Sequence, residues 1–371
     1  MAIVIRSPNW IGDCIMCLPA LRALKTHLPD EKIYLAVKHY LCDVYKNLEG
    51  IKEIIPIPDH VNLKNLLNII TQFKKYHFTS GILFTNSFHS ALLFKLAGIH
   101  DLTGYSKDLR GFLLDKKIEF NIVSHENNRH HIYFYMDLVS LFLKEKKNNQ
   151  TIEINKRYSD ELPVPLIEKK NAQSLLSGLG INLANKRIGI SPSAAYGSAK
   201  QWPPQKFGEL INRIQTEMPG YEILLFGSAG ERKRISQIMD ICHSLNKNNN
   251  NKGNLHNLHN LHNLHNLAGQ LKLGEVIAAI SLCNMFISND SGLMHVAYSL
   301  NIPLAAIFGP TQPHKTGPLP EYHPKIKILY HPVSCAPCNY RDCPTDHACM
   351  NAVSVPDVLN AIHALQEREK N

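Results

Sequence analysis

The stretch AIVIRSPNWIGDCIMCLPALRALKTH, residues 2–27, decides the fold class of this chain. Residues 2–7 form a short apolar run with β-branched side chains, which predicts a buried strand. Pro8 and Asn9 then predict a turn. Apolar residues at helical spacing from Ile11 to His27 predict a helix directly after the turn. A strand followed at once by a helix is the first half of a βαβ unit.

The same alternation of strands and helices continues along the chain. Further strands are predicted over residues 33–37, 54–57, 81–85, 187–190, 222–226, 285–288 and 303–308. Helices are predicted over residues 63–73, 90–96 and 204–216. This pattern predicts parallel sheets with crossover helices. Because 371 residues exceed one ordinary core, we expect two α/β domains, with Lys144–Pro165 as the linker.

The charge balance favours an anionic partner. The chain has 40 Lys and Arg against 31 Asp and Glu, a net charge of +9. Such a balance suits nucleic acid, a phosphorylated ligand or an acidic membrane surface. No zinc-finger spacing, RNA-binding aromatic signature or basic-region helix is present, so nucleic acid is not expected. With no signal peptide and no run of about 18 apolar residues, the protein is expected in the cytoplasm.

An asparagine-rich tract at residues 246–266 runs into four copies of Asn-Leu-His. One interpretation is a metal-binding tract formed by His256, His259, His262 and His265. The other is a repeat expansion in a surface loop, where insertions are tolerated.

The loop between the first strand and the first helix, residues 6–13, is a candidate site. In open α/β sheets, ligands bind beyond the carboxyl ends of the strands. Asp13 at the helix start could take a proton from an attacking hydroxyl group, and Gly12 would let a substrate approach the backbone. Alternatively, Asp13 is an N-cap that accepts free backbone N–H groups.

Three loops of the second half follow predicted strands in the same way. Residues 191–203 carry small residues and then Lys200 before a helix, which suggests phosphate binding, although the order of a P-loop is absent. Residues 226–231 lack the Gly-x-Gly-x-x-Gly pattern of nicotinamide binding, but Glu231 could accept from ribose hydroxyls. Residues 288–295 place Asp, Ser and Gly at a helix start, which suits a diphosphate.

Each of these features also has a purely structural interpretation. Lys200 could be a solvated surface lysine, and Glu231 an acid in the first turn of a helix. The segment Asp290–Gly292 could be an ordinary helix cap. His295 comes one turn later, points inward, and is typical of a structural histidine.

Together these segments resemble the ADP-heptose–lipopolysaccharide heptosyltransferases of glycosyltransferase family nine, and among them heptosyltransferase II most. The resemblance rests on PNWIGDCIMCLPALRALK, NSFHSALLF, GYSKDLRGFLL, AKQWPPQKF, LLFGSAGE, NLAGQ, NDSGLMHVAYSLNIPLAAIFGPTQP and CAPCNYRDCPTDHACM. These stretches span nearly the whole chain in order, and NDSGLMHVA and PNWIGD are the most specific.

The resemblance implies a GT-B architecture, with two Rossmann-like domains facing across a cleft. Residues 1–160 would bind the acceptor, residues 161–350 would bind ADP-heptose, and residues 351–371 would form a C-terminal helix. The implied reaction is inverting and metal-independent. It transfers L-glycero-D-manno-heptose from ADP-heptose to the first heptose of the lipopolysaccharide inner core (heptosyl-Kdo2-lipid A). No cofactor is implied besides this co-substrate, and a lipid-linked acceptor implies transient docking at the inner face of the inner membrane.

The expected site residues follow from the resemblance and the loops together. The catalytic base falls on Asp13 and the diphosphate-binding lysine on Lys200. The other expected donor-binding residues are Ser193, Gly227, Ser228, Glu231, Asp290, Ser291, Gly292, Leu293 and His295. The expected acceptor-binding residues are Asn9 and Arg110, with Arg6, Lys107 and Arg129 as further cationic candidates.

Two segments depart from the family pattern, and one cluster leaves its chemistry open. Pro192-Ser193-Ala194 stands where a Pro-Gly-Ala-like loop is usual, and the repeats run straight into Leu267-Ala268-Gly269 beside the expected adenine pocket. Four cysteines with His347 resemble a zinc cluster of unusually compact spacing; they are Cys335, Cys338, Cys343 and Cys349. Reduced structural thiols are the alternative, and a disulfide is less expected in a cytosolic protein.

Three other functions remain as alternatives. Heptosyltransferase I, which acts one sugar earlier, is the nearest, although the PNWIGD opening and the cysteine run favour II. A sugar-nucleotide epimerase would need a pair of carboxylates around the sugar, and no such pair is evident. A non-catalytic nucleotide-binding or lipid A-binding module is the third.

Overall fold

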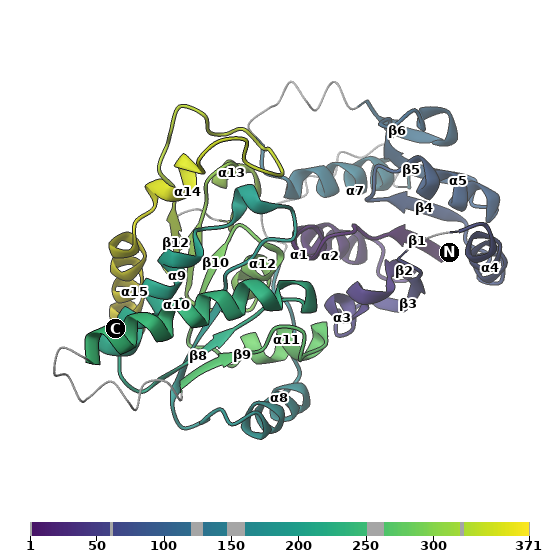
Figure 1. Cartoon of the computed structure of the whole chain (residues 1–371). Helices are drawn as coiled ribbons and strands as arrows, with labels where there is room; N and C mark the ends of the chain where they lie inside the picture. The colour runs from purple at the N-terminus through teal and green to yellow at the C-terminus, as the bar shows by residue number, and fades with distance from the viewer. Residues whose placement is uncertain are drawn as a thin grey trace. The chain divides into compact units, whose positions relative to one another are not determined.

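The computed structural model describes residues 2–59, 62–119, 129–146, 160–250, 263–319 and 323–370. It divides into two compact units, Met1–Pro163 and Val164–Asn371 (Figure 1). Each unit is built around a parallel sheet. None of the helices in these ranges has the length and apolar character needed to cross a bilayer.

The sheet of the first unit has the strand order β3-β2-β1-β4-β5-β6. Its strands are β1 (Ala2–Arg6), β2 (Lys32–Lys38), β3 (Ile51–Ile57), β4 (Ser80–Leu83), β5 (Asp101–Tyr105) and β6 (Lys116–Ile118). Its α-helices are α1 (Ile11–Met16), α2 (Leu18–His27), α3 (Cys42–Tyr45), α4 (Leu63–Lys74), α5 (Phe88–Leu96) and α7 (Ile132–Lys146). This is the doubly wound order, in which the chain reverses direction between β1 and β4, and ligands bind at that switch point.

One predicted helix of the first unit is in fact two. The sequence predicts a single helix from Ile11 to His27, but α1 ends at Met16 and α2 starts at Leu18. Pro19 lies in the first turn of α2. Since proline lacks an N–H group and crowds the preceding turn, it is well placed there but not in the middle of a helix. The break leaves α1 as a short helix that carries Asp13.

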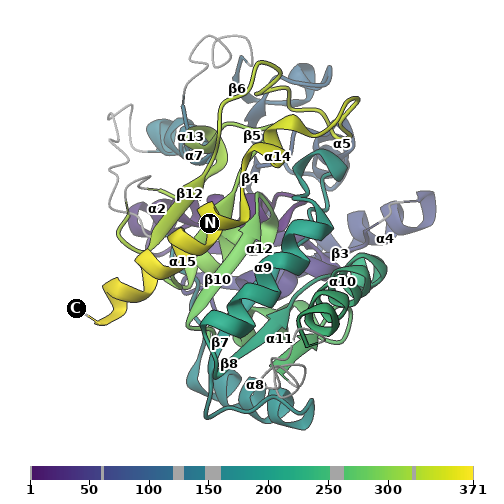
Figure 2. The ribbon, with the colours of Figure 1, turned by 60° about the vertical axis from the view of Figure 1, so that its left-hand side comes forward.

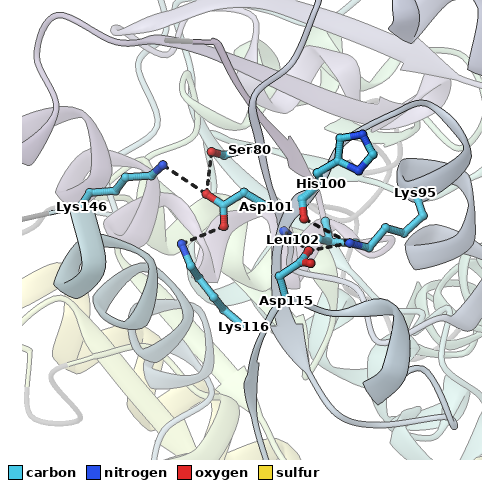
Figure 3. A network of polar contacts seen from close by, with 8 residues as sticks. All are labelled: Ser80, Lys95, His100, Asp101, Leu102, Asp115, Lys116 and Lys146. Carbon is cyan, nitrogen blue, oxygen red and sulfur yellow. Dashed lines mark hydrogen bonds and ion pairs between the residues drawn. The ribbon is translucent and has the colours of Figure 1, made fainter.

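A charged cluster fixes the amino-terminal ends of β4, β5 and β6 (Figure 3). Asp101 accepts a hydrogen bond from Ser80 at 2.8 Å and pairs with Lys116 at 2.7 Å and with Lys146, the last residue of α7, at 3.1 Å. Burial of Asp101 opposes its charge, but these donors outweigh that effect and lower the pKa of the carboxyl. The cluster therefore anchors the C-terminus of α7 to the amino-terminal ends of the strands, whereas the switch point lies at their carboxyl ends.

A second acid completes this cluster. Asp115 pairs with Lys95 at 2.6 Å and accepts a hydrogen bond from the Leu102 backbone N–H at 2.8 Å. Lys95 also donates to the backbone oxygen of His100 at 3.1 Å. Figure 3 shows both acids pointing toward lysines from neighbouring elements.

The second unit repeats the same order as β12-β11-β10-β7-β8-β9. Its strands are β7 (Lys186–Ser191), β8 (Tyr221–Leu225), β9 (Leu264–Asn266), β10 (Met285–Asn289), β11 (Leu304–Ile307) and β12 (Ile326–Leu329). Its α-helices are α8 (Leu166–Gly178), α9 (Pro204–Glu217), α10 (Arg232–Asn250), α11 (Leu273–Ile280), α12 (Gly292–Ser299), α13 (Pro313–Thr316), α14 (Ala348–Ala352) and α15 (Val355–Lys370). The switch point of this sheet lies between β7 and β10.

The C-terminal helix α15 is part of the core of the second unit. It lies against α9 (Figure 2), and its apolar face joins a buried cluster with Phe207 and Ile211 of α9. Trp202 is fully buried in the same cluster and donates its indole N–H to the backbone oxygen of Val353 at 3.0 Å. The segment that follows the cysteine-rich stretch therefore closes the core that supports the Lys200 loop.

The last copy of the Asn-Leu-His repeat has a definite role in the fold. Its residues Leu264 and His265 belong to β9, which pairs with β8. His265 lies 2.6 Å from Glu222 of β8, and both side chains are largely buried. The other repeat histidines, His256, His259 and His262, lie outside the described residues, so the metal-binding interpretation of the tract stays a hypothesis.

Candidate active site

A pocket of about 330 Å³ lies in the first unit, at the carboxyl ends of the strands. The loop after β1 contributes Asn9, helix α1 contributes Asp13, and the loop after β4 contributes Asn86. His131, directly before α7, and Tyr135, in its first turn, line the pocket as well. The pocket therefore occupies the switch point between β1 and β4, where this fold class binds its ligands.

Asp13 is held inside the pocket by two side chains of the α7 region. The N-cap position of α1 is occupied by Trp10, so Asp13 is the third residue of the helix and not the cap. Its Oδ1 lies 3.6 Å from Nε2 of His131, and its carboxyl is hydrogen bonded to Tyr135. The side chain of Asp13 is 26% exposed. A carboxylate in this position is accessible to a hydroxyl group in the pocket.

The loop that carries Asn9 is fixed by a buried arginine. Arg6 is only 4% exposed and donates to Asn9 Oδ1 at 2.7 Å and to the backbone oxygen of Ser7 at 2.5 Å. Burial is the main cause that lowers the pKa of Arg6 to about 10. The guanidinium of Arg6 therefore holds the loop itself, and the expected contact of Arg6 with the acceptor stays a prediction.

Arg110 has a similar structural setting. Its side chain is fully buried, with Nε donating to the Tyr105 backbone oxygen at 2.9 Å and Nη1 to the Thr85 backbone oxygen at 2.5 Å. Nη2 donates to Asn86 Oδ1 at 3.1 Å. Arg110 was expected to contact the acceptor directly. The structure instead shows it joining the loops that follow β4 and β5, both of which line the pocket.

The two other cationic candidates differ from each other. Arg129 makes a two-pronged pair with Asp137, at 3.0 and 3.2 Å, and lies over the ring of Tyr133 at 4.8 Å. Lys107 is exposed on the loop after β5. The acceptor contacts expected of Arg129 and Lys107 stay predictions.

In the second unit, Lys200 and Asp290 meet at the other switch point. Lys200 Nζ lies 2.5 Å from Asp290 Oδ2, and the two side chains are 13% and 5% exposed. Thr311, which follows β11, donates to the same carboxylate oxygen at 2.7 Å. Lys200 also lies 5.1 Å above the ring of Tyr196. The solvated-lysine interpretation is therefore wrong, since Lys200 is held in a largely buried pair.

Two polar atoms near this pair are buried without a hydrogen-bond partner among the described residues. They are Ser193 Oγ, in the loop after β7, and Asn289 Nδ2, at the end of β10. The other side-chain atom of Asn289, Oδ1, accepts the Trp202 backbone N–H at 3.2 Å. A buried hydroxyl and a buried amide left unsatisfied beside a charged pair suit a ligand that brings its own hydrogen-bonding groups.

Helix α12 begins beside these groups. Ser291 is its N-cap residue, Gly292 is its first residue, and Leu293 follows. Ser291 Oγ lies 3.0 Å from Ser288 Oγ, so the expected capping sequence does stand at a helix start. The N-terminus of a helix of this length attracts anions. His295, one turn later, is buried, as its inward position predicts.

In the loop after β8, Glu231 is an acid in the first turn of a helix, as its structural interpretation predicts. Glu231 Oε2 accepts the Ser228 backbone N–H at 2.7 Å, and the Ser228 side chain accepts the Glu231 backbone N–H, which together form a capping box. The Ser228 hydroxyl also lies 2.9 Å from Glu231 Oε2. Gly227 accepts the Gly269 N–H at 3.0 Å. A Cβ on Gly269 would lie 2.6 Å from the Cα of Ala229, so only glycine fits there. The expected ribose contact of Glu231 stays a prediction.

The cysteine-rich stretch supports the Lys200 loop from outside. Arg341 accepts the Ala199 N–H on its backbone oxygen at 3.1 Å, and Asp342 accepts the Ser198 hydroxyl at 2.8 Å. A Cβ on Gly197 would lie 2.1 Å from the Arg341 oxygen. The conformation of the loop before Lys200 therefore depends on residues far along the chain.

The four C-terminal cysteines are free thiols of different exposure. Cys335 is exposed, Cys338 and Cys343 are half-buried, and Cys349 is buried. Across the described ranges, no set of three or more His, Cys, Asp and Glu side chains has a geometry that could hold a metal ion.

Comparison with known proteins gives the family. The profile of "Glycosyltransferase family 9 (heptosyltransferase)" matches residues 66–349, about three quarters of the chain. The chain belongs to glycosyltransferase family 9. This family 9 enzyme is 27% identical to the lipopolysaccharide heptosyltransferase 2 of Escherichia coli K12 over 344 residues, 90% of either chain. It is 26% identical to the Salmonella typhimurium protein of the same name over 341 residues, again 90% of each.

Comparison with solved structures gives the fold. The solved structure of E. coli ADP-heptose lps heptosyltransferase II matches with a TM-score of 0.80 at 24% identity, covering 100% of both chains. The expected α/β GT-B fold class of this glycosyltransferase is therefore confirmed. The lipopolysaccharide heptosyltransferase 1 of Pseudomonas aeruginosa is 32% identical over 145 residues, which are 39% of this chain and 34% of that protein.

The structure adds three residues that the sequence did not single out in this family 9 enzyme. His131 and Tyr135 contact Asp13, and Thr311 contacts Asp290. Thr311 lies within the matching stretch GPTQP, so the resemblance held a signal for it. His131 and Tyr135 lie outside every stretch that carried the resemblance, and only the tertiary fold brings them to Asp13.

Proposed function

We propose that this chain transfers L-glycero-D-manno-heptose from ADP-heptose to the first heptose of the lipopolysaccharide inner core, with inversion at the anomeric carbon. The proposal relies on the accessible carboxylate of Asp13 in the pocket at the first switch point. The coverage of the relatives favours this acceptor over the one used by heptosyltransferase I. The relatives named heptosyltransferase 2 match over nearly the whole chain, whereas the one named heptosyltransferase 1 matches only part of it.

In this proposal Asp13 takes the proton of the acceptor hydroxyl. An aspartate has an ordinary pKa near 3.9, so it is a weak base toward a sugar hydroxyl. Proton transfer must then accompany formation of the new C–O bond. General base catalysis of this kind contributes about 10²–10⁴-fold, and the rest must come from positioning and from stabilisation of the leaving group.

The leaving ADP would be stabilised in the second unit by fixed positive potential. Lys200 and the N-terminus of α12 provide it, and the unsatisfied Ser193 Oγ and Asn289 Nδ2 offer further hydrogen bonds. Asp290 already neutralises Lys200, so the diphosphate would share the lysine with this carboxylate. We propose that transfer needs no metal ion, and excess chelator should then leave the rate unchanged.

The test measures ADP release by the purified full-length chain with ADP-heptose and each of two acceptors, Kdo2-lipid A with and without its first heptose. We expect turnover only with the heptosylated acceptor. Turnover only with the unheptosylated acceptor would assign the activity of heptosyltransferase I. Conversion of ADP-heptose without any acceptor would indicate an epimerase, and ADP binding without reaction would indicate a binding module.

Two aspartate variants test the base. Asp13→Asn should reduce the rate by at least 10²-fold while ADP still binds. Asp30 has an exposed carboxylate in the turn after α2 and does not line this pocket, so Asp30→Asn is the control and should retain the activity. Near-normal turnover of Asp13→Asn would refute the assignment.

We further propose that the chain is a cytoplasmic protein that docks peripherally on the inner face of the inner membrane. Leu109 is 89% exposed and Phe112 is 77% exposed, on either side of the buried Arg110. Both follow Asp108 of the pocket, and Lys107 beside them is exposed. Apolar side chains next to a cation suit an anionic lipid surface, which is where a lipid-linked acceptor resides.

Sedimentation with vesicles tests this docking. The chain should bind vesicles that contain anionic lipid, and the binding should weaken with added salt. Leu109→Ser with Phe112→Ser should reduce binding, whereas Leu166→Ser with Ile167→Ser, two exposed apolar residues of α8, should not. Equal loss in both double variants would contradict the assignment of this loop.

A further inference from the structure

The carboxylate of Asp13 is flanked by two side chains that the proposed reaction has not yet used. His131 directly precedes α7, and its Nε2 lies 3.6 Å from Asp13 Oδ1. Tyr135, one turn into α7, is 4% exposed and is hydrogen bonded to the same carboxyl. Both line the pocket together with Asp13, so a substrate hydroxyl near Asp13 would also be near them.

Aromatic contacts fix the direction of the imidazole. The ring of His131 stacks on Phe134, with centroids 4.8 Å apart and planes at 26°. It also meets the ring of Tyr135 edge-on, at 5.5 Å and 83°. Since rings packed in this way have little freedom to rotate, Nε2 is kept facing Asp13. A histidine that served only to fill space would not need its nitrogen aimed at a carboxylate.

The surroundings set the protonation of both side chains. Burial lowers the pKa of His131, and the negative charge of Asp13 opposes this effect only in part. Burial and the Asp13 charge both raise the pKa of Tyr135. His131 is therefore neutral at pH 7 and able to accept a proton. Tyr135 stays protonated, so its hydroxyl donates to Asp13.

No cation lines the described part of this pocket. The other titratable side chains that face it are Asp108, from the loop after β5, and Tyr105, from β5 itself. The thiols of Cys17 and Cys14 also raise the pKa of Tyr135, but less than Asp13 does. The imidazole is therefore the one neutral base among the described lining residues that stands beside the Asp13 carboxylate.

We infer that His131 and Tyr135 are positioning residues for Asp13, and that His131 receives the proton that Asp13 removes from the acceptor. Tyr135 orients the carboxylate by donating a hydrogen bond to it, so that one oxygen faces the acceptor hydroxyl. The inference deepens the proposed function and rests on Asp13 being the base.

The proposed transfer conserves the proton and the electron pair. As the acceptor oxygen bonds to the anomeric carbon, the bond from that carbon to the diphosphate breaks and ADP leaves with the electron pair. The hydroxyl proton passes to Asp13 and then to Nε2 of His131, which releases it to water. An imidazole is ordinarily on the order of a few hundred-fold more basic than an aspartate, and burial of His131 reduces this difference. Because His131 then releases the proton to water, the second transfer restores the Asp13 carboxylate for the next turnover.

The inference predicts the direction of the pH dependence. Below the pKa of His131 the imidazole carries a proton, pairs with Asp13 and can no longer accept a second proton. The rate should therefore fall as the pH drops through the pKa of His131, which is below the ordinary value of about 6.5. His131→Gln has no titrating group at this position, so that acid limb should disappear.

Steady-state kinetics of the full chain with ADP-heptose and the heptosylated acceptor test the relay. His131→Gln should lower kcat by about 10–100-fold, with the KM for ADP-heptose within about twofold. Tyr135→Phe should lower kcat less and should keep the acid limb. His89→Gln, at an exposed histidine on α5, is the matched control and should behave like the wild type.

Chemical rescue separates the relay from a structural role. Added imidazole should restore part of the rate of His131→Ala, but none of the rate of Asp13→Asn. A His131→Gln enzyme with normal kcat and an intact acid limb would overturn the inference, as would a loss of rate in His131→Ala that imidazole does not restore. Should His131→Gln fail to fold, His131→Asn tests the loss of kcat and of the acid limb in its place, and the imidazole experiment is unaffected.

The same experiments distinguish failure of this inference from failure of the proposed function. If the wild type turns over and Asp13→Asn does not, while His131→Gln is normal, only the relay is wrong. If Asp13→Asn is as active as the wild type, both the relay and the assignment of Asp13 as the base are wrong. If the wild type releases no ADP with either acceptor, the proposed function itself fails.

Discussion

Substitution of Arg110 tests whether this residue organises the pocket or binds the acceptor. The guanidinium joins the backbone oxygens of Thr85 and Tyr105 to the side chain of Asn86, from a fully buried position. Burial lowers its pKa to about 10, so the protein bears a cost for keeping this charge inside. Arg110→Leu removes the charge, its hydrogen bonds and that cost together.

The expected change in the free energy of unfolding follows from these opposing contributions. Hydrogen bonds of a charged group contribute about 1.5–3 kcal/mol each, and three of them join Tyr105 to the adjacent residues Thr85 and Asn86. Because leucine has no charge to bury, the variant avoids a desolvation penalty of several kcal/mol. We therefore expect Arg110→Leu to destabilise the first unit by about 2–4 kcal/mol. Arg110→Lys keeps the charge but cannot span three acceptors, so it should cost about half as much.

Urea unfolding followed by circular dichroism measures these changes, and amide hydrogen exchange locates them. Exchange should quicken in the loops after β4 and β5 in both variants and stay unchanged in the second unit. The KM for the acceptor should rise because the loop that carries Asn86 loosens. An unchanged unfolding midpoint and unchanged exchange in Arg110→Lys, with a raised acceptor KM, would refute this reasoning and restore direct acceptor binding.

Three further predictions concern other parts of the chain. Lys200→Ala should weaken ADP-heptose binding by about 10–100-fold and slow turnover, as calorimetry and kinetics would show; unchanged affinity would contradict its role at the diphosphate. Asp101→Asn should lower the thermal midpoint at pH 7. Since folding lowers the pKa of Asp101, this effect is fully present above the unfolded pKa of about 3.9 and is lost as the pH falls through the lower pKa of the folded state; an effect that does not shrink with acidification would exclude the carboxylate charge as the cause. Deletion of residues 257–262, two copies of the repeat, should leave the thermal midpoint nearly unchanged because β9 uses only the last copy.

The core strands of both sheets could be predicted because each is a short apolar run with β-branched side chains. β1, β2, β7 and β10 are buried along most of their length, as parallel strands require. The sequence did not indicate β5, in which Asp101 and Gly104 interrupt the apolar run. It did not indicate β9 either, because Leu-His-Asn is also part of a repeat. Such strands are fixed by pairing with a neighbour and not by their own residues.

The candidate site could be predicted as far as the loops that follow predicted strands. Asp13, Lys200 and Asp290 each stand just after a strand, so the fold rule alone brings them to the carboxyl edge. The pairing of Lys200 with Asp290 could not be predicted, because it depends on β7 and β10 being neighbours. His131 lies far from Asp13 in sequence, so only the packing of α7 in the folded first unit reveals the contact.

The contact between Gly197 and Arg341 has a consequence for protein engineering. The backbone there leaves no room for a side chain, and the neighbouring residues Ser198 and Ala199 are also bonded to residues 341 and 342. A transplant of residues 191–203 into another scaffold would bring Lys200 but not the shape of its loop. A working graft would have to include residues 339–342 as well, and a library that diversifies either segment should vary the two jointly.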